Sequence, residues 1–246
     1  MMTKQVNIRE IALGILMEIT EEEAYSHIVL REVLEKYQYL EKRDRAFISR
    51  VVEGTLEHMI QLDYIIEQFS NVPVYNMKPL IRNLLRMSVY QLKYMDSVPD
   101  SAVCNEAVKI AQRRGFYNLK GFVNGVLRNT ARRLSQVKYP DENLDPLHYL
   151  SVRYSFPIWM LDKWMQQFGY ETTEKICRDT HMKKGTVVRC DLQKASKEEI
   201  IEELKKDGAS VREHPYLDYA LVLSDYNYRY IYRYIPSIPS QSYIKH

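Results

Sequence analysis

A pair of predicted helices in residues 98–133 constrains the fold more than any other part of the chain. Asp100 or Ser101 can cap the first helix, whose apolar residues recur three and four positions apart. Gly115 suits the position just past that helix, and a second helix with the same apolar spacing begins near Leu119. The stretch therefore predicts a helical hairpin.

Positive charge is concentrated in the same part of the chain. The net charge over 246 residues is +3. Residues 1–77 hold 8 Lys and Arg against 13 Asp and Glu, whereas residues 78–136 hold 11 against 3, and the remainder is balanced. A basic middle third favours a nucleic-acid partner. On spacing alone, two core helices with a solvated basic rim are the interpretation that we prefer.

The cysteines and the hydropathy pattern predict a cytoplasmic protein. Cys104, Cys177 and Cys190 lie far apart and form neither a disulfide framework nor a zinc pattern, which is typical of a reducing compartment. No stretch approaches the roughly 20 apolar residues of a membrane helix, so no membrane partner is expected. The six histidines are scattered, and no metal site is expected.

The sequence before residue 137 is predicted to be helical throughout. Asn7 can cap the first helix, and a short second helix is expected at 27–37. Asp44 can begin a longer helix, in which Gly54 indicates a close helix crossing or a local break. Pro79 suits the first turn of the next helix.

The character of the sequence changes after Gln136, where the polar, proline-flanked run KYPDENLDP predicts a domain boundary. Helices are expected at 145–153 and 157–168, the second with Trp159 and Trp164 as core anchors. A strand, a helix and a strand are then predicted at 186–192, 196–207 and 220–224. This order indicates a small α+β module.

The last stretch alternates tyrosine with Asn, Arg and Ile. Five rings would share one face of a strand, and these are Tyr226, Tyr228, Tyr230, Tyr232 and Tyr234. One interpretation is an aromatic and basic strip that stacks on RNA bases. The other, which we prefer, is an irregular terminus.

Several linked motifs resemble a known family. The run LLRMSVYQLKYMDSVPDSAVCNEAVKIAQ, followed by GFVNGVLRN, resembles the NusB-type helical RNA-binding domain over residues 8–133. That domain occurs alone in transcription antitermination factors and also begins the RsmB-type 16S rRNA cytosine-C5 methyltransferases. The block DRAFISRVVEGTLEHMIQLDYII and the LRN at 127–129 favour the methyltransferase branch. SFPIWMLDKWMQQFG, at 155–169, resembles its connecting module.

The resemblance implies a mainly α fold, with a NusB-like all-helical bundle followed by a small α+β module. The predicted domains are an RNA-binding bundle at 1–136, a connecting module at 137–225 and an irregular Tyr-rich tail at 226–246. In complete enzymes of this family, a later domain holds S-adenosylmethionine in a glycine-rich loop and supplies two reactive cysteines. This chain has neither feature, so we expect a truncated relative that is inactive alone, with no catalytic or cofactor-binding residues.

The predicted function is RNA binding, with 16S rRNA as the expected partner. The residues expected to meet phosphates are Arg82, Arg86, Arg113, Arg114, Lys120, Arg128, Arg132 and Arg133. Four further residues match the family motif and are assigned mainly to structure, namely Asn105, Glu106, Phe122 and Asn124. Two alternatives stay open: a NusB-like antitermination factor acting through RNA and protein contacts, and an enzyme whose catalytic domain is a separate chain.

Overall fold

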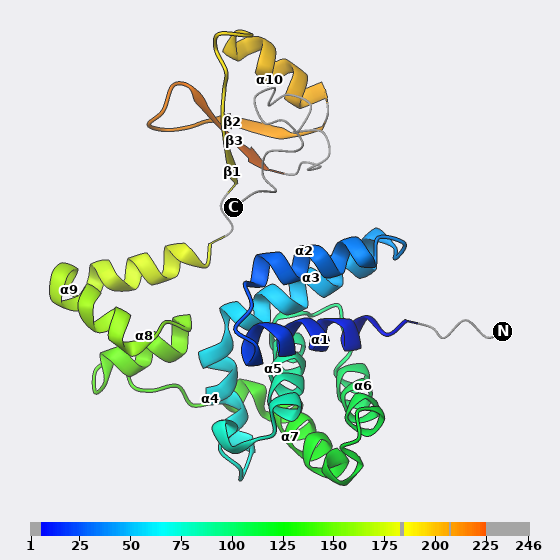
Figure 1. The fold of residues 1–246 in the computed structure, drawn as a ribbon. Coiled ribbons are helices and arrows are strands. Elements are labelled where there is room, and N and C mark those ends of the chain that lie inside the picture. Colours follow the sequence, from blue (N-terminus) through cyan, green and yellow to red (C-terminus); the bar gives the residue numbers. More distant parts are fainter. Residues whose placement is uncertain (1–5, 183–184, 207, 225–246) are drawn as a thin grey trace. The chain divides into compact units, whose positions relative to one another are not determined.

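The computed structural model describes residues 6–182, 185–206 and 208–224, and the chain divides into two compact units after His181 (Figure 1). The helices of the first unit are α1 Ile8–Glu21, α2 Ser26–Lys36, α3 Lys42–Glu57, α4 Met59–Phe69, α5 Pro79–Tyr94, α6 Asp100–Arg113, α7 Lys120–Arg133, α8 Pro146–Tyr154 and α9 Ile158–Thr180. The second unit contains β1 Thr186–Arg189, α10 Lys197–Lys206, β2 Ser210–Glu213 and β3 Ala220–Ser224. The mainly α fold class is confirmed.

Two local signals begin helices where the sequence predicts them, at α1 and α5. The predicted cap of α6 by Asp100 or Ser101 is wrong, because Asp100 is already the first residue of that helix and no side chain caps it. Helix α3 begins at Lys42, two residues before Asp44. The side-chain oxygen of Asn7 accepts hydrogen bonds from the backbone N–H groups of Arg9 and Glu10, at 3.0 and 3.1 Å, and so caps α1. Pro79 occupies the first turn of α5, where its missing N–H costs nothing. The hairpin is also confirmed, because Gly115 follows α6 with a positive φ of 87°.

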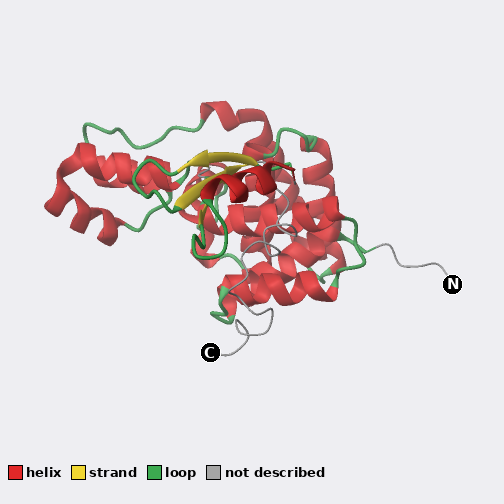
Figure 2. Ribbon diagram, turned by 90° about the horizontal axis from the view of Figure 1, so that it is seen from above, coloured by secondary structure: helices red, strands yellow, loops and turns green. Residues whose placement is uncertain are grey.

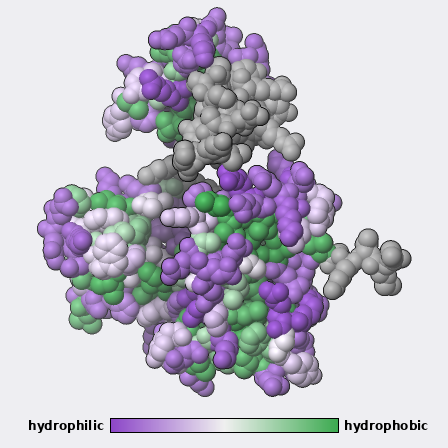
Figure 3. Space-filling view, in the orientation of Figure 1, coloured by the Kyte–Doolittle hydropathy of each residue, from purple (hydrophilic) through white to green (hydrophobic). Residues whose placement is uncertain are grey.

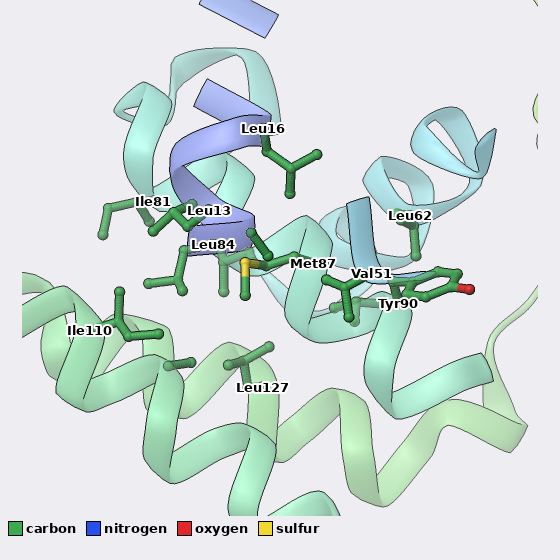
Figure 4. Close-up of a cluster of buried hydrophobic side chains, with 14 of the residues drawn as sticks. Leu13, Leu16, Val51, Leu62, Ile81, Leu84, Met87, Tyr90, Ile110 and Leu127 are labelled. Carbon is green, nitrogen blue, oxygen red and sulfur yellow. The ribbon is translucent and has the colours of Figure 1, made fainter. Parts of the chain in front are cut away.

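Helix α5 is the centre of the first unit. It packs against α1, α3, α4, α6 and α7, and every residue from 83 to 91 is buried. Figure 4 shows Leu84 and Met87 of α5 among side chains from neighbouring helices, including Leu13 and Leu127. Burial of a side chain of this size stabilises the fold by about 2 kcal/mol. A helix that is enclosed on so many sides must also find partners for its polar residues inside the bundle.

Gly54 marks a close helix crossing, one of the two alternatives that its place in the pattern predicts. A Cβ atom added at Gly54 would lie 2.0 Å from a ring carbon of Tyr90. Glycine therefore lets α3 approach the Tyr90 ring on α5 more closely than any other residue could. The apolar pattern of α3 continues into α4, but the helix is interrupted at His58.

Helices α8 and α9 pack with the bundle as part of the first unit. The side-chain amide of Gln61 on α4 donates to the carbonyl oxygens of Val152 and Arg153, at 3.2 and 3.0 Å. Trp164 packs near Phe156, as a core anchor should. The prediction for Trp159 is wrong: it is 61% exposed, because in the first turn of α9 it faces away from the small core that these helices share.

The second unit contains a three-stranded antiparallel sheet in the order β1-β3-β2. Its strands are drawn in yellow in Figure 2. Its core contains Leu204 of α10 together with Leu221 and Leu223 of β3. The predicted strand, helix and strand are present, and β2 is an additional strand that the sequence pattern did not identify. The alternation of buried and exposed residues in β2 is weak, because three of its four residues are exposed.

The predicted domain boundaries at residues 136 and 225 stay predictions. The compact units of the structure divide at another place, after His181. The tyrosine run from 226 to 234 lies outside the described residues. Among the helices that the structure describes, none combines the length and apolar character needed to cross a membrane.

Candidate nucleic-acid interface

The groove between α6 and α7 is lined by basic and neutral polar side chains together with small apolar ones and one carboxylate, that of Asp100, and we call it the α6–α7 seam. It contains two hollows along the same pair of helices. The first, of about 460 Å³, is lined by Asn105, Val108, Lys109, Lys120, Gly121 and Asn124. The second, of about 380 Å³, is lined by Asp100, Ser101, Cys104, Arg128, Ala131 and Arg132.

Four side chains on α7 form a row along the seam. Lys120, Asn124, Arg128 and Arg132 are each four residues apart and therefore share one face of the helix. With a rise of 1.5 Å per residue, the row is about 18 Å long. Figure 3 shows hydrophilic residues across the visible face of the bundle with hydrophobic residues between them, so hydropathy alone does not distinguish a binding surface.

Two asparagines hold the guanidinium group of Arg128. Its Nε donates to Oδ1 of Asn124 at 2.8 Å on the same helix, and its Nη2 donates to Oδ1 of Asn105 across the seam at 3.4 Å. Arg132 donates from Nε to the backbone carbonyl of Arg128 at 3.2 Å. Within the described residues, no protein acceptor pairs with Nη1 of Arg128. The seam thus presents fixed donors, an arrangement that suits an anionic ligand.

Lys120 lies beside an exposed aromatic ring at the first end of the row. Its ammonium group is 3.9 Å from the ring centroid of Tyr117, which is 58% exposed. Hydrogen bonding and attraction from Lys120 lower the pKa of Tyr117. An exposed ring next to a cation can stack on a nucleic-acid base while the cation meets a phosphate.

Glu106 is an acceptor at the same end of α6 and links the hairpin to the first helix. It accepts from Lys109 at 2.8 Å and from the side-chain amide of Asn7 at 3.1 Å. Hydrogen bonds from Lys109 and Asn7 lower the pKa of Glu106 against the opposing effect of burial. Phe122, in turn, packs on the bundle core. Both placements agree with the structural roles that the sequence assigns to these residues.

The structure brings three of the predicted basic residues together on the seam, namely Lys120, Arg128 and Arg132. Three others do not line it, and each lies beside another helix. Arg113 is 3.4 Å from the carboxylate of Glu10, and Arg114 lines a separate hollow of about 460 Å³ beside α1 and α2. Arg133 lies 5.1 Å from the ring centroid of Phe69 at the end of α4.

Arg82 and Arg86 are both paired with carboxylates, Arg86 largely inside the bundle and Arg82 near its surface. Arg86 binds Asp63 of α4 through two hydrogen bonds of 2.6 Å, and Arg82 binds Glu21 of α1 at 2.8 Å. Burial raises the pKa of Asp63, and the bonds to Arg86 oppose that effect. The sequence places both arginines on a more polar side of α5. That side faces protein, because α5 is enclosed by its neighbours.

Sequence reasoning missed one cation and underrated two amides on the seam. Lys109 was not among the expected phosphate contacts, and Asn105 and Asn124 were assigned mainly to structure. The signal was present: Ser101, Asn105 and Lys109 repeat every four residues on α6, opposite the row on α7. Two facing rows with the same spacing indicate a continuous polar groove.

The three cysteines are buried, so their thiols are poor candidates for chemistry. Burial raises the pKa of Cys177 to about 11, and it also raises the pKa of Cys104 and Cys190. Cys104 lines the seam, but the residue is only 2% exposed. We therefore describe the seam as a binding surface.

Comparison with known proteins identifies two matching regions. The family model described as "NusB family" matches residues 6–132, and the one described as "Methyltr_RsmF/B-like, ferredoxin-like domain" matches residues 156–227. The chain is 36% identical over 208 residues to the probable ribosomal RNA small subunit methyltransferase B of Bacillus subtilis (strain 168), covering 85% of this chain and 46% of that protein. The chain spans about half the length of the methyltransferases that it matches.

Two further similarities concern the bundle and the fold. The chain is 35% identical over 127 residues to the transcription antitermination protein NusB of Bacillus velezensis, covering 51% of this chain and 94% of that protein. The crystal structure of PH0851 aligns with 92% of this chain and 50% of its own length, with a TM-score of 0.59 at 19% identity. At that identity the structural match supports the fold alone.

Proposed function

We propose that this chain, which belongs to the NusB family, binds RNA through the α6–α7 seam and forms the RNA-binding portion of a small-subunit rRNA methyltransferase. The bundle supplies affinity for phosphates. Recognition of a particular site on the 16S rRNA would then depend on further contacts, since phosphate contacts position a protein without reading sequence.

The observation that carries this proposal is the fixed guanidinium group of Arg128. Asn105 and Asn124 hold it between two helices, with Lys120 and Arg132 on the same row. A cation that is already oriented loses less side-chain entropy when it binds a phosphate than a freely moving surface arginine does. Both asparagines use their oxygens for Arg128, so their amide N–H groups stay available as donors.

The relatives support rRNA as the class of ligand. The Bacillus subtilis relative is named as a ribosomal RNA small subunit methyltransferase, and residues 156–227 match a domain described for that group. Methyl transfer itself, with S-adenosylmethionine as the methyl donor, is proposed only for the longer protein. Labelled S-adenosylmethionine incubated with this chain and deproteinised small-subunit rRNA should give no incorporation. Incorporation by this chain would assign the chemistry to it.

A second candidate is a transcription antitermination role, as in NusB. It is favoured by the 35% identity that extends over 94% of the Bacillus velezensis protein. The match of residues 156–227 favours the methyltransferase role. Tight binding to an elongation-complex protein, with weak binding to rRNA, would support the antitermination role instead.

The seam is tested by measuring RNA affinity against salt with small-subunit rRNA fragments and fluorescence anisotropy. If Lys109, Lys120, Arg128 and Arg132 each neutralise a phosphate, the slope of log affinity against log salt is about −3 on single-stranded RNA. Replacing both arginines, in the double variant Arg128→Gln and Arg132→Gln, should reduce the magnitude of the slope by about 1.4.

A matched control removes two exposed cations of α3, in the double variant Lys42→Gln and Arg43→Gln. This control has the same change in net charge and should keep the wild-type slope. Equal losses in both double variants would mean that the effect comes from net charge rather than from the seam. Binding that does not depend on salt would contradict the phosphate contacts.

A further inference from the structure

Three side chains with metal-binding atoms meet where the end of α9 lies against the break between α3 and α4. They are Glu57, His58 and His181, and one ligand atom from each lies within 4.8 Å of the others. Sequence spacing did not indicate this group, because Glu57 and His181 are 124 positions apart. The fold removes that separation, so the scattering of the histidines along the chain no longer argues against a metal site.

His181 is held in the orientation that a metal ligand needs. Its Nε2 is 2.7 Å from the backbone carbonyl oxygen of Tyr154, which can only accept a hydrogen bond, so Nε2 carries a proton. A histidine that binds a metal commonly donates its other ring N–H to such an oxygen, because that bond fixes the tautomer and the direction of the ring. The Nδ1 atom of His181 is then directed toward Glu57.

The hydrogen bonds in this group are incomplete. Nδ1 of His181 lies 3.0 Å from Oε1 of Glu57, and an ionised carboxylate only accepts. Nδ1 of His58 is buried and has no hydrogen-bond partner among the described residues. A proton between His181 and Glu57 would serve those two atoms and leave His58 unpaired. A metal ion would serve all three side chains.

The surrounding charges act in both directions. Burial and the nearby Glu57 raise the pKa of Glu53, one turn earlier on α3, so a cation at Glu57 would relieve the repulsion between two carboxylates. Burial lowers the pKa of His58 and the charge of Lys93 on α5 adds to that effect, so Lys93 would oppose a bound cation. The side chain of Glu57 is 50% exposed, which gives an ion access from solvent.

We propose that Glu57, His58 and His181 form a binding site for one divalent ion of the Zn²⁺ class, which joins the end of α9 to the break between α3 and α4. Two imidazole nitrogens and one carboxylate oxygen are ligands that Zn²⁺ accepts, with water in the remaining position. Mg²⁺ and Ca²⁺ prefer oxygen ligands and should bind poorly. The proposal does not depend on RNA binding.

One ring must turn when the ion binds. Metal–ligand distances of about 2.1 Å place two ligand atoms of a tetrahedral ion about 3.4 Å apart, close to the separation of His181 and Glu57. The ring planes of His58 and His181 differ by 15° and their centroids are 5.1 Å apart, whereas the lone pair of an imidazole nitrogen lies in the plane of its ring. His58 is the ring that can turn, because its Nδ1 has no hydrogen bond to lose. Turning it gives up the stacking on Tyr94, whose ring centroid is 4.3 Å away.

Isothermal titration of the whole chain with Zn²⁺, after removal of metal with a chelator, tests the site. The wild type should bind one ion per chain. Glu57→Gln, His58→Ala and His181→Ala should each weaken that binding by at least about 100-fold, the upper end of what the loss of an outer hydrogen bond around a metal costs. Thermal unfolding is the second measurement. Zn²⁺ should raise the unfolding temperature of the wild type but not that of the variants, because an ion that binds only the folded state stabilises it.

His148→Ala is the matched control, because His148 is an exposed histidine of α8 with a carboxylate 3.8 Å away. It should bind Zn²⁺ as the wild type does. Co²⁺ in place of Zn²⁺ identifies the ligands, since thiolates add an intense near-ultraviolet absorption that imidazole and carboxylate do not give.

A wild-type affinity for Zn²⁺ no higher than that of Glu57→Gln would overturn the proposal and leave a proton between Glu57 and His181. Zinc binding that all three variants retain would also overturn it. So would a thiolate absorption with Co²⁺, which would assign the ion to the cysteines. Glu57→Gln keeps the test decisive even if a histidine variant fails to fold, because this position is half-exposed.

Discussion

The basic residues of α5 and α7 come from one positively charged stretch of sequence, yet they lie in opposite surroundings. Arg86 of α5 is 8% exposed and donates two hydrogen bonds to the carboxylate of Asp63. Arg128 of α7 is exposed, and both of its side-chain acceptors are neutral amides. The difference arises because α5 is enclosed by five helices, whereas α7 contacts three, namely α4, α5 and α6, and leaves Arg128 and Arg132 exposed. A cluster of arginines in the sequence therefore has no single meaning.

The two groups of arginines also differ in what they contribute to stability. Breaking a buried ion pair by removing one partner costs about 3–5 kcal/mol, because an uncompensated charge stays behind. An exposed pair contributes about 0–1 kcal/mol. We therefore expect Arg86 of α5 to hold the bundle together, and Arg128 and Arg132 of α7 to remain available for a ligand.

The largest expected effect is that of Arg86→Ala, which should lower the free energy of unfolding by about 3 kcal/mol, the lower end of the cost of breaking a buried ion pair, because the Asp63 side chain is 27% exposed. Asp63 then stays partly buried without its partner, so the loss should be larger at neutral pH than at acidic pH. The sign follows from the raised pKa of Asp63: protonation at low pH removes the buried charge, and rising pH restores it. Denaturant unfolding at several pH values measures this effect.

A loss of RNA affinity in Arg86→Ala without a loss of stability would contradict the structural role of Arg86. Folded Arg86→Ala protein should bind RNA as the wild type does, with an unchanged salt slope. The arginines of the seam should show the reverse, with weaker binding and a free energy of unfolding within about 0.5 kcal/mol of the wild type.

A smaller loss is expected from Gly54→Ala, which tests the crowding around α5. The added Cβ collides with the buried Tyr90 ring, and overpacking of this kind costs about 1–3 kcal/mol. Gly14→Ala is the matched control, because a Cβ there meets nothing within 4 Å. That control should stabilise α1 by up to about 1 kcal/mol. Thermal unfolding of both variants distinguishes crowding from helix propensity. Equal shifts of the unfolding temperature in the two variants would contradict the crowding around α5.

The smallest expected effect is that of Asn124→Ala, which sharpens the comparison at the seam. The variant removes one acceptor that holds Arg128 but leaves every cation in place. RNA affinity should fall by about fivefold, in line with a hydrogen bond of about 1 kcal/mol. The salt slope should stay unchanged, because it counts phosphate contacts. A reduced slope would mean that Arg128 no longer reaches the RNA at all.

Sequence reasoning predicted the helices well and the site in part. Asn7, Pro79 and Gly115 act through their own backbone, so their roles can be identified from local sequence. Strand β2 and the exposure of Trp159 were not predicted, because each depends on what the rest of the chain covers. On the seam, three of the eight expected basic residues lie together, and Lys109 was missed.

The sequence by itself determined a helical bundle, a small α+β unit and a basic middle region, since periodicity, caps and charge are local properties. Only the tertiary structure decided which cations are free to bind. Arg86 meets a carboxylate 23 positions earlier in the chain, and Arg128 meets an amide 23 positions away on another helix. Such pairings depend on how the helices cross, and the free energy of an ion pair depends on how much water the neighbouring helices exclude.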